Sequence, residues 1–240
     1  MKISNNKILI TGGGSGIGLG LTERFIKDNN TVIICGRDQA KLKTVSEEFP
    51  NVITKMCDLS SKKERIELFK WIQENHPDLN VLINNAGIQQ WMNISDDDFY
   101  QKTEQEIIIN ILTPIHLTTL FSKLKSLETI VNVTSGLAFI PFSKVPVYSG
   151  TKAFMRSFTM SLRHQMKPRN VEIVEIIPPA LNTNLGGTGL HNGQPEVSDF
   201  IESVFQQLSE GKTELTFGFS KERTEDNNKT IQAYFEKLNP

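Results

Sequence analysis

The chain alternates short apolar runs with longer segments of helical spacing, and this alternation limits the folds open to it. The runs are rich in β-branched residues, which predicts strands. They cover residues 7–11, 31–35, 52–57, 80–85, 129–134, 171–177 and 215–219. Between them, Ile66, Phe69 and Ile72 form an apolar stripe on a charged segment, as in an amphipathic helix.

Near-continuous apolar strands separated by helices predict an α/β fold with a sheet covered on both faces. We therefore expect a Rossmann-type, doubly wound, mostly parallel seven-stranded sheet. A (β/α)₈ barrel is the structural alternative, but seven runs in 240 residues and one long connection, 85–128, argue against it. No domain boundary is visible, so residues 1–240 are expected to form one domain.

Composition restricts the partners. A net charge of -1 gives no basic surface for nucleic acid or a membrane, so a small-molecule partner is favoured. The first ten residues lack the apolar core of a signal peptide, and no run approaches the ~20 residues of a membrane span, which predicts a cytoplasmic protein. Cys35 and Cys57 end two predicted strands without a Cys/His cluster and should be buried free thiols.

Glycines crowd the stretch "TGGGSGIGLG", residues 11–20, directly after the first predicted strand. Gly12, Gly16 and Gly18 would lie where the strand passes into a helix, so that backbone N–H groups and the helix dipole can receive a pyrophosphate. The spacing matches neither G-x-G-x-x-G nor the phosphate loop G-x-x-x-x-G-K-[ST]. A glycine-rich turn without a ligand is the alternative.

The second predicted strand ends "CGRD", which bears on the choice of nucleotide. Gly36 stands where an acid would bind a free ribose 2′-hydroxyl, and the Arg37 guanidinium that follows suits a 2′-phosphate. This favours NADP(H) over NAD(H), unless Arg37 is an ordinary solvated side chain. Asp38 should cap the next helix. Asp58 is suitably placed for an adenine edge but could equally be a helix cap.

Tyr148 and Lys152 are four residues apart on a predicted helix and therefore share one face. A nearby ammonium favours the phenolate, so Lys152 is expected to lower the pKa of Tyr148 and make it a proton donor or acceptor near neutral pH. A solvated pair of neighbours is the alternative.

Taken together, these motifs resemble the short-chain dehydrogenase/reductase family. The resemblance rests on "TGGGSGIG", "NNAG" at 84–87, Asn110 in a long predicted helix, Ser135 after the fifth strand, and "YSGTK" from Tyr148. The order and spacings match over most of the chain. The sequence also looks similar to a bacterial branch associated with genes for D-alanine esterification of teichoic acids. Its residues describe a redox site, so the resemblance implies no role in D-alanine transfer.

The resemblance implies a role for each of four polar side chains. Tyr148 would exchange a proton with the substrate oxygen, while Lys152 would lower the Tyr148 pKa and hold the nicotinamide ribose. Ser135 would orient the substrate oxygen, and Asn110 would hold a water that passes protons to Lys152. The chain would then transfer hydride between NADP(H) and a small carbonyl or secondary alcohol.

The resemblance also implies a row of cofactor contacts and no metal. The contacts would be Gly12, Ser15, Gly16, Ile17, Gly18, Arg37, Asp58, Leu59, Asn85, Ala86, Gly87, Tyr148, Lys152, Pro178 and Thr183. Two departures from the family pattern stand out. Pro179 replaces a usual glycine, so the local turn must differ. The C-terminus lacks a glycine-rich interface strand, which leaves a homodimer or another homo-oligomer rather than the usual tetramer.

The Gly- and Asn-rich residues 184–196 are expected to form a mobile lid, in which His191 has no catalytic role. Near it, an apolar pocket is expected from Trp91, Leu137, Phe139 and Phe142, although these side chains could instead be core. A last amphipathic helix is expected at 231–238. The rival functions are an NAD(H)-dependent dehydrogenase and a non-catalytic NADP-binding regulator. Ser135 argues against the latter, because cofactor binding alone does not require it.

Overall fold

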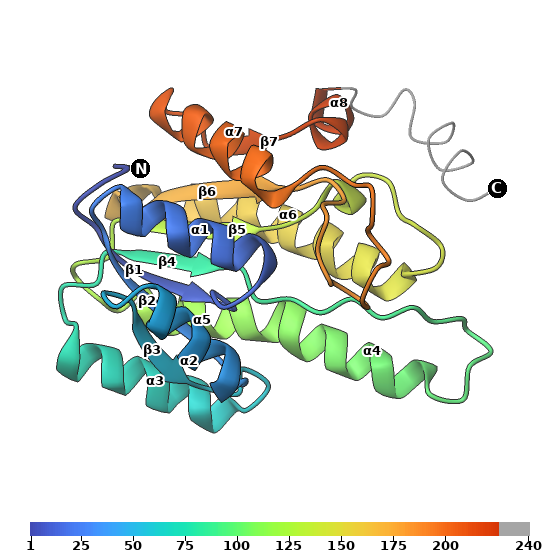
Figure 1. Cartoon of the computed structure of the whole chain (residues 1–240), viewed down its shortest axis with the longest axis horizontal. Coiled ribbons are helices and arrows are strands. Elements are labelled where there is room, and N and C mark those ends of the chain that lie inside the picture. The colour runs from blue at the N-terminus through green and yellow to red at the C-terminus, as the bar shows by residue number, and fades with distance from the viewer. Residues whose placement is uncertain (226–240) are drawn as a thin grey trace.

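A seven-stranded parallel sheet forms the centre of the protein, as the computed structural model, which describes residues 1–225, shows (Figure 1). The strand order is β3-β2-β1-β4-β5-β6-β7. The strands are β1 Lys7–Thr11, β2 Thr31–Gly36, β3 Ile53–Met56, β4 Val81–Asn84, β5 Thr129–Val133, β6 Glu172–Ile177 and β7 Glu214–Thr216. This open sheet confirms the doubly wound α/β prediction and excludes the barrel.

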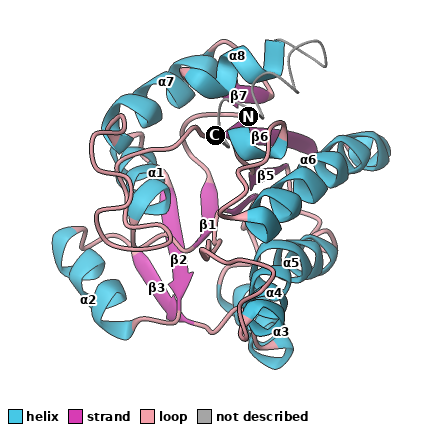
Figure 2. Cartoon of the chain, turned by 90° about the vertical axis from the view of Figure 1, so that its right-hand side faces the viewer, coloured by secondary structure: helices cyan, strands magenta, loops and turns pink. Residues whose placement is uncertain are grey.

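Helices cover both faces of the sheet. They are α1 Gly16–Lys27, α2 Gln39–Glu48, α3 Lys62–Asn75, α4 Phe99–Ile107, α5 Thr113–Phe121, α6 Pro146–Met166, α7 Val197–Ser209 and α8 Phe219–Glu225. Figure 2 shows α1, α2 and α7 on one side of the strands and α3 to α6 on the other. A π-helical segment, Ile108–Leu112, joins α4 to α5, and short 3-10 turns span Gly136–Ala138 and Lys167–Arg169.

Two apolar cores follow from the alternation of side chains along each strand. Ile8 and Ile10 of β1 pack with Phe25 and Phe205 beneath α1 and α7, whereas Leu9 points the other way into a core with α3 and α5. None of the helices in residues 1–225 is long and apolar enough to cross a membrane.

The strand order reverses between β1 and β4, which pair side by side at the centre of the sheet. In open α/β sheets, ligands bind beyond the carboxyl ends of the strands at such a switch point. Gly12 follows β1 and Asn85 follows β4. The Asn85 side chain donates a hydrogen bond to the Thr11 carbonyl at 2.9 Å, which fastens the two loops together.

Several local predictions need correction. The buried face of α3 contains Leu68, Phe69 and Ile72, whereas Ile66 is only partly buried. The last strand is shorter than the predicted 215–219, because Gly218 at φ +50° turns the chain into α8.

Cys35 and Cys57 are buried free thiols, as predicted. The helix predicted at 231–238 lies outside the described residues.

Candidate active site

The glycine turn after β1 has little or no room for a side chain at positions 12 and 18. A Cβ at Gly18 would lie 2.2 Å from the Gly12 carbonyl oxygen, and one at Gly12 would lie 3.2 Å from the Ala86 Cα. Gly12 and Gly16 also adopt positive φ angles of +65° and +52°, which favour glycine. The turn therefore brings bare backbone to the N-terminus of α1, as phosphate binding requires.

Residues 184–196 form a loop without helix or strand whose ends are tied together. Asn182 donates from its backbone to the Pro195 carbonyl at 2.9 Å and from its side chain to Glu196 at 2.8 Å. At the base of the loop, Thr183 lies 3.5 Å from the position of a Cβ on Gly16. His191 contacts the Leu185 carbonyl within the loop at 3.0 Å. Thr183 is thus beside the glycine turn.

At the carboxyl end of β2, Asp38 caps α2 as predicted and accepts a hydrogen bond from the Lys41 backbone at 3.1 Å. Among the described residues, nothing lies within 4 Å of a Cβ placed on Gly36. Arg37 is exposed beside this opening. The surroundings at this edge of the sheet can therefore admit a ribose phosphate.

Asp58, after β3, interacts electrostatically with Arg37. Hydrogen bonds from Ser60, and secondarily the charge of Arg37, hold the Asp58 pKa below its usual range. Ser61 caps α3, so the alternative of Asp58 as a helix cap is wrong. Leu59 buries its side chain in the core, which leaves its backbone as the part that could meet a cofactor.

Tyr148, Ser135 and Lys152 gather where α6 crosses the end of β5. All three are buried, and the Tyr148 hydroxyl is hydrogen-bonded to Ser135. The Lys152 ammonium donates to the Val133 carbonyl at 2.9 Å and lies 5.5 Å from the centre of the Tyr148 ring. The helical spacing thus places both α6 side chains beside Ser135, and the alternative of a solvated pair is wrong.

Burial dominates the electrostatics of this cluster. It raises the pKa of Tyr148, against the Ser135 hydrogen bond, while the charge of Glu106 raises it further. Burial lowers the pKa of Lys152 to about 8, and the attraction of Glu106 opposes this shift. The Tyr148 pKa therefore moves in the direction opposite to the prediction, because desolvation of the phenolate outweighs the effect expected from the lysine.

Asn110 lies in the π-helical segment and orders the chain after β4. Its Oδ1 accepts from the Ile88 backbone N–H at 2.9 Å, and its Nδ2 donates to the Ile88 carbonyl at 2.8 Å and to Thr151 at 3.1 Å. Pro114 has no N–H, so the Asn110 carbonyl cannot accept the usual α-helical bond from residue i+4. Sequence reasoning found Asn110 but missed the π-helical turn, for which Pro114 was the available signal.

The residues predicted around the pocket separate into two groups. Trp91 and Phe142 meet edge to face with ring centres 6.1 Å apart, and Trp91 is 40% exposed. Phe139 instead packs beneath the Arg156 guanidinium at 4.3 Å. Leu137 is half-buried and donates its backbone N–H to the Ser135 hydroxyl at 3.1 Å. Of these four residues, Trp91 and Phe142 form the aromatic pair that is accessible to a substrate.

The loop after β6 is fastened to the loop that carries Ser135. Gly136 donates its N–H to the Pro178 carbonyl at 2.9 Å. From α8, buried Arg223 donates to the Gly136 carbonyl at 3.1 Å. Sequence reasoning missed this contribution of α8, because no local pattern near residue 223 points to the fifth strand.

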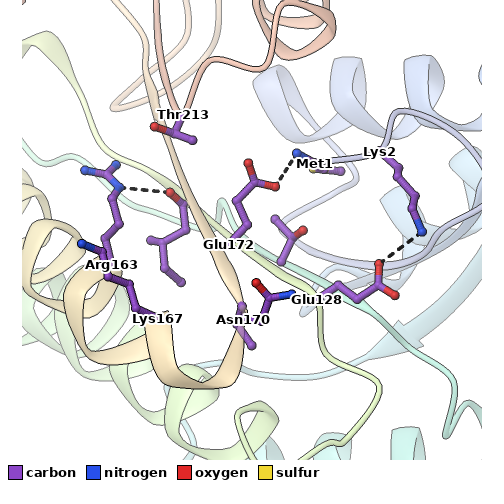
Figure 3. A pocket seen from close by; sticks show the side chains of 11 residues that line it. Met1, Lys2, Glu128, Arg163, Lys167, Asn170, Glu172 and Thr213 are labelled. Atoms are coloured by element: carbon purple, nitrogen blue, oxygen red, sulfur yellow. Dashed lines mark hydrogen bonds and ion pairs between the residues drawn. The ribbon is translucent and has the colours of Figure 1, made fainter.

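A hollow at the opposite end of the strands has no cluster like that of Ser135, Tyr148 and Lys152 among its lining residues. Figure 3 shows it near the amino ends of β5 and β6, with the Met1 amino group paired to Glu172 and Lys2 to Glu128. Arg163 also lines it. Within residues 1–225 no cluster of three or more His, Cys, Asp or Glu side chains could hold a metal ion. The chemistry is concentrated at the carboxyl ends of the strands.

The doubly wound sheet, the glycine turn and the buried Ser–Tyr–Lys cluster define a Rossmann-type oxidoreductase. The comparisons give the family. The family model described as short chain dehydrogenase matches residues 6–191. The chain belongs to the short-chain dehydrogenase/reductase family, and it is an oxidoreductase.

The relatives agree with this assignment. The chain is 40% identical to the uncharacterized oxidoreductase DltE of Bacillus subtilis over 99% of this chain and 96% of the relative, which supports the bacterial branch named above. Two solved structures share the fold. A short chain dehydrogenase from Burkholderia cenocepacia in complex with NADP has a TM-score of 0.86 at 23% identity, covering 99% of each chain. A short chain dehydrogenase/reductase from Burkholderia phymatum in complex with NAD has a TM-score of 0.83 at 16% identity, covering 100% of this chain and 97% of the other.

Proposed function

We propose that this protein is an NADP(H)-dependent oxidoreductase that interconverts a small carbonyl compound and a secondary alcohol. The observation that carries the proposal is the buried Tyr148–Ser135 hydrogen bond beside Lys152. Cofactor binding alone needs no such pair, so it argues against a purely regulatory NADP-binding protein. It is suited to holding and protonating a substrate oxygen.

The residues of the glycine turn fit a dinucleotide, because glycine at positions 12 and 18 lets the turn pack tightly and leaves bare backbone at the N-terminus of α1. When bound, the nicotinamide would supply or accept the hydride. We assign the pyrophosphate to the N-terminus of α1 and the nicotinamide end to Thr183. The proposed cofactor contacts are Gly12, Ser15, Gly16, Ile17, Gly18, Arg37, Asp58, Leu59, Asn85, Ala86, Gly87, Tyr148, Lys152, Pro178 and Thr183.

In the reductive direction, Tyr148 donates its hydroxyl proton to the substrate oxygen, which becomes an alcohol. Ser135 orients the same oxygen through a hydrogen bond. The resulting phenolate is costly in a buried site, so the positive charge of Lys152 stabilises it. Asn110 keeps a carbonyl available for a water that returns a proton towards Lys152. In the oxidative direction each proton moves the opposite way.

The preference for NADP(H) rests on Gly36 and Arg37. Position 36, where an acid would recognise a free 2′-hydroxyl, is a glycine with open space around it, and exposed Arg37 can pair with a phosphate. The two Burkholderia structures carry NADP in one case and NAD in the other. An NAD(H)-dependent enzyme with the same catalytic residues is therefore the second candidate.

We further propose that residues 1–240 form one catalytic domain in which 184–196 is a lid. The tie between Asn182 and Pro195 leaves the intervening loop able to move as a unit. The exposed pair of Trp91 and Phe142 favours an apolar substrate group. A cytoplasmic location stays a prediction from the sequence.

A homodimer is the proposed assembly. Leu112 and Phe154 expose 48% and 45% of their surface on neighbouring helical segments, an apolar area that a second copy could cover. Light scattering should give the mass of a dimer, and Phe154→Glu should shift the protein to a monomer. A monomeric wild-type protein at micromolar concentration would contradict this assembly.

The proposed activity can be tested by screening apolar ketones and aldehydes with the wild-type protein and NADPH. Loss of NADPH absorbance, with formation of the alcohol confirmed by chromatography, is expected for at least one compound. Ser135→Ala is the matched variant, because it removes the hydroxyl while the bond from the Gly136 N–H to the Pro178 carbonyl still holds the loop. Equal turnover by wild type and this variant would contradict the role of Ser135.

A further inference from the structure

Glu106 is a buried carboxyl group to which the proposed reaction gives no role. It lies on the last turn of α4, four residues before Asn110, and is 0% exposed. Its Oε1 accepts a hydrogen bond from the Gln90 backbone N–H at 2.6 Å. Within residues 1–225 its Oε2 has no hydrogen-bond partner. Burying a carboxylate with one oxygen unpaired is costly, so the ionised form of Glu106 needs a compensating charge.

Lys152 is the charged group that acts electrostatically on Glu106. Asn110 and Lys152 border the same residue, because their Oδ1 and Nζ lie 3.4 and 3.6 Å from a Cβ placed on Gly87. Glu106 is one helical turn from Asn110 on this side of α4. The carboxyl and the ammonium attract each other electrostatically, and within residues 1–225 no other charged group shifts the pKa of either one.

The other groups around Glu106 do not supply that charge. From α6, the titratable neighbours are Lys152 and Tyr148, and Tyr148 is neutral in its protonated form. The chain at 87–90 packs on Glu106 with the uncharged sequence Gly-Ile-Gln-Gln. On α4 itself, Lys102 forms an ion pair with Asp98 at 3.0 Å. Lys152 is thus the cation available to the buried carboxylate.

We propose that Glu106 is the counter-ion of Lys152, a positioning residue that keeps the buried lysine protonated. The effect of Glu106 on turnover rests on the proposed function, which this inference deepens. The charge on Lys152 stabilises the Tyr148 phenolate, so Glu106 acts on the reaction through the lysine. The charge of Glu106 also raises the pKa of Tyr148 directly, so its favourable effect on the phenol is exerted through the protonated lysine.

The pair has a defined working range of pH. Burial raises the pKa of Glu106 to about 7 and lowers that of Lys152 to about 8. Below the first value Glu106 is protonated and loses its charge, whereas above the second Lys152 is neutral. Both groups are charged together mainly between these values. Without the carboxylate, the Lys152 ammonium is less stable and its pKa falls.

The test is a pH titration of the Lys152 ammonium by lysine-selective ¹H–¹⁵N NMR of the full chain without cofactor. Lys152→Met assigns the signal. Glu106→Gln keeps the side-chain size and an oxygen for the Gln90 N–H, but removes the charge. Glu104→Gln removes an exposed charge from the same helix and is the matched control. We expect E106Q to lower the Lys152 pKa by about one unit or more, and E104Q to leave it unchanged.

An unchanged Lys152 pKa in folded E106Q overturns the proposal. If E106Q does not fold, Glu106→Asp is the test variant, because a shorter acid attracts the ammonium less strongly and should lower the Lys152 pKa. A Lys152 pKa equal to that of the wild type would overturn the proposal. In the carbonyl assay, the alkaline limb of kcat should shift to lower pH in E106Q, with KM changed less than about twofold. Absence of wild-type turnover would contradict the proposed function but leave the NMR result valid.

Discussion

Tyr148→Phe should lower kcat by about 10²- to 10⁴-fold, the usual range for removing a general acid. The variant loses the hydroxyl that gives a proton to the substrate oxygen, while the ring keeps its place in the buried cluster with Ser135 and Lys152. Cofactor binding should change by less than about threefold, because only the hydroxyl of one proposed cofactor contact is lost and the glycine turn is untouched. Steady-state kinetics and a fluorescence titration with NADPH measure the two effects.

Tyr100→Phe is the matched control for this experiment. Tyr100 is 72% exposed on α4, so the same chemical change there should leave both kcat and NADPH affinity unaltered. Turnover by Tyr148→Phe at the wild-type rate would contradict the proton-transfer role. A regulatory NADP-binding protein would show no turnover in any variant.

Arg37→Ala should weaken NADPH binding by about 10- to 100-fold and NADH binding by less than about threefold. A charge-assisted hydrogen bond to a phosphate contributes about 1.5–3 kcal/mol, and NADH lacks the 2′-phosphate that would receive it. Arg37 is exposed after β2, so its removal should leave the melting temperature nearly unchanged. Parallel titrations of wild type and variant with both nucleotides give the comparison.

Lys63→Ala removes one positive charge at an exposed position on α3 and serves as the control. It should reduce the affinity for either nucleotide very little, since exposed charges are screened by salt. If Arg37→Ala weakens NADPH and NADH equally, Arg37 does not recognise the 2′-phosphate. The cofactor preference would then need another explanation.

The sequence predicted the features that depend on local backbone geometry and side-chain period. Strand alternation places Ile8 and Leu9 in different cores, and the requirement for bare backbone at Gly12 and Gly18 is visible as a motif. The spacing between Tyr148 and Lys152 put both on one face of α6. Such features can be predicted from the sequence without knowledge of tertiary packing.

The features that the sequence did not predict depend on contacts between distant segments. The Tyr148 pKa is raised because its hydroxyl is buried where α6 packs on the turn after β5, and the residues next to it in the sequence do not reveal this burial. In the sequence, Glu106 is an ordinary acidic residue of a predicted helix. Its burial becomes visible only in the fold, where the backbone at Gln90 lies against it. Arg223 reaches Gly136 only because α8 folds back across the end of the sheet. Long-range burial, rather than local pattern, sets the electrostatics of the site.

The most direct test of the account is a fluorescence titration of the purified wild-type protein with NADPH and NADH at one salt concentration. We predict saturable binding of both, with NADPH at least about tenfold tighter, because the glycine turn serves either nucleotide and Arg37 adds a phosphate contact. Tighter binding of NADH, or binding of neither nucleotide, would contradict the claim that this protein is an NADP(H)-dependent oxidoreductase.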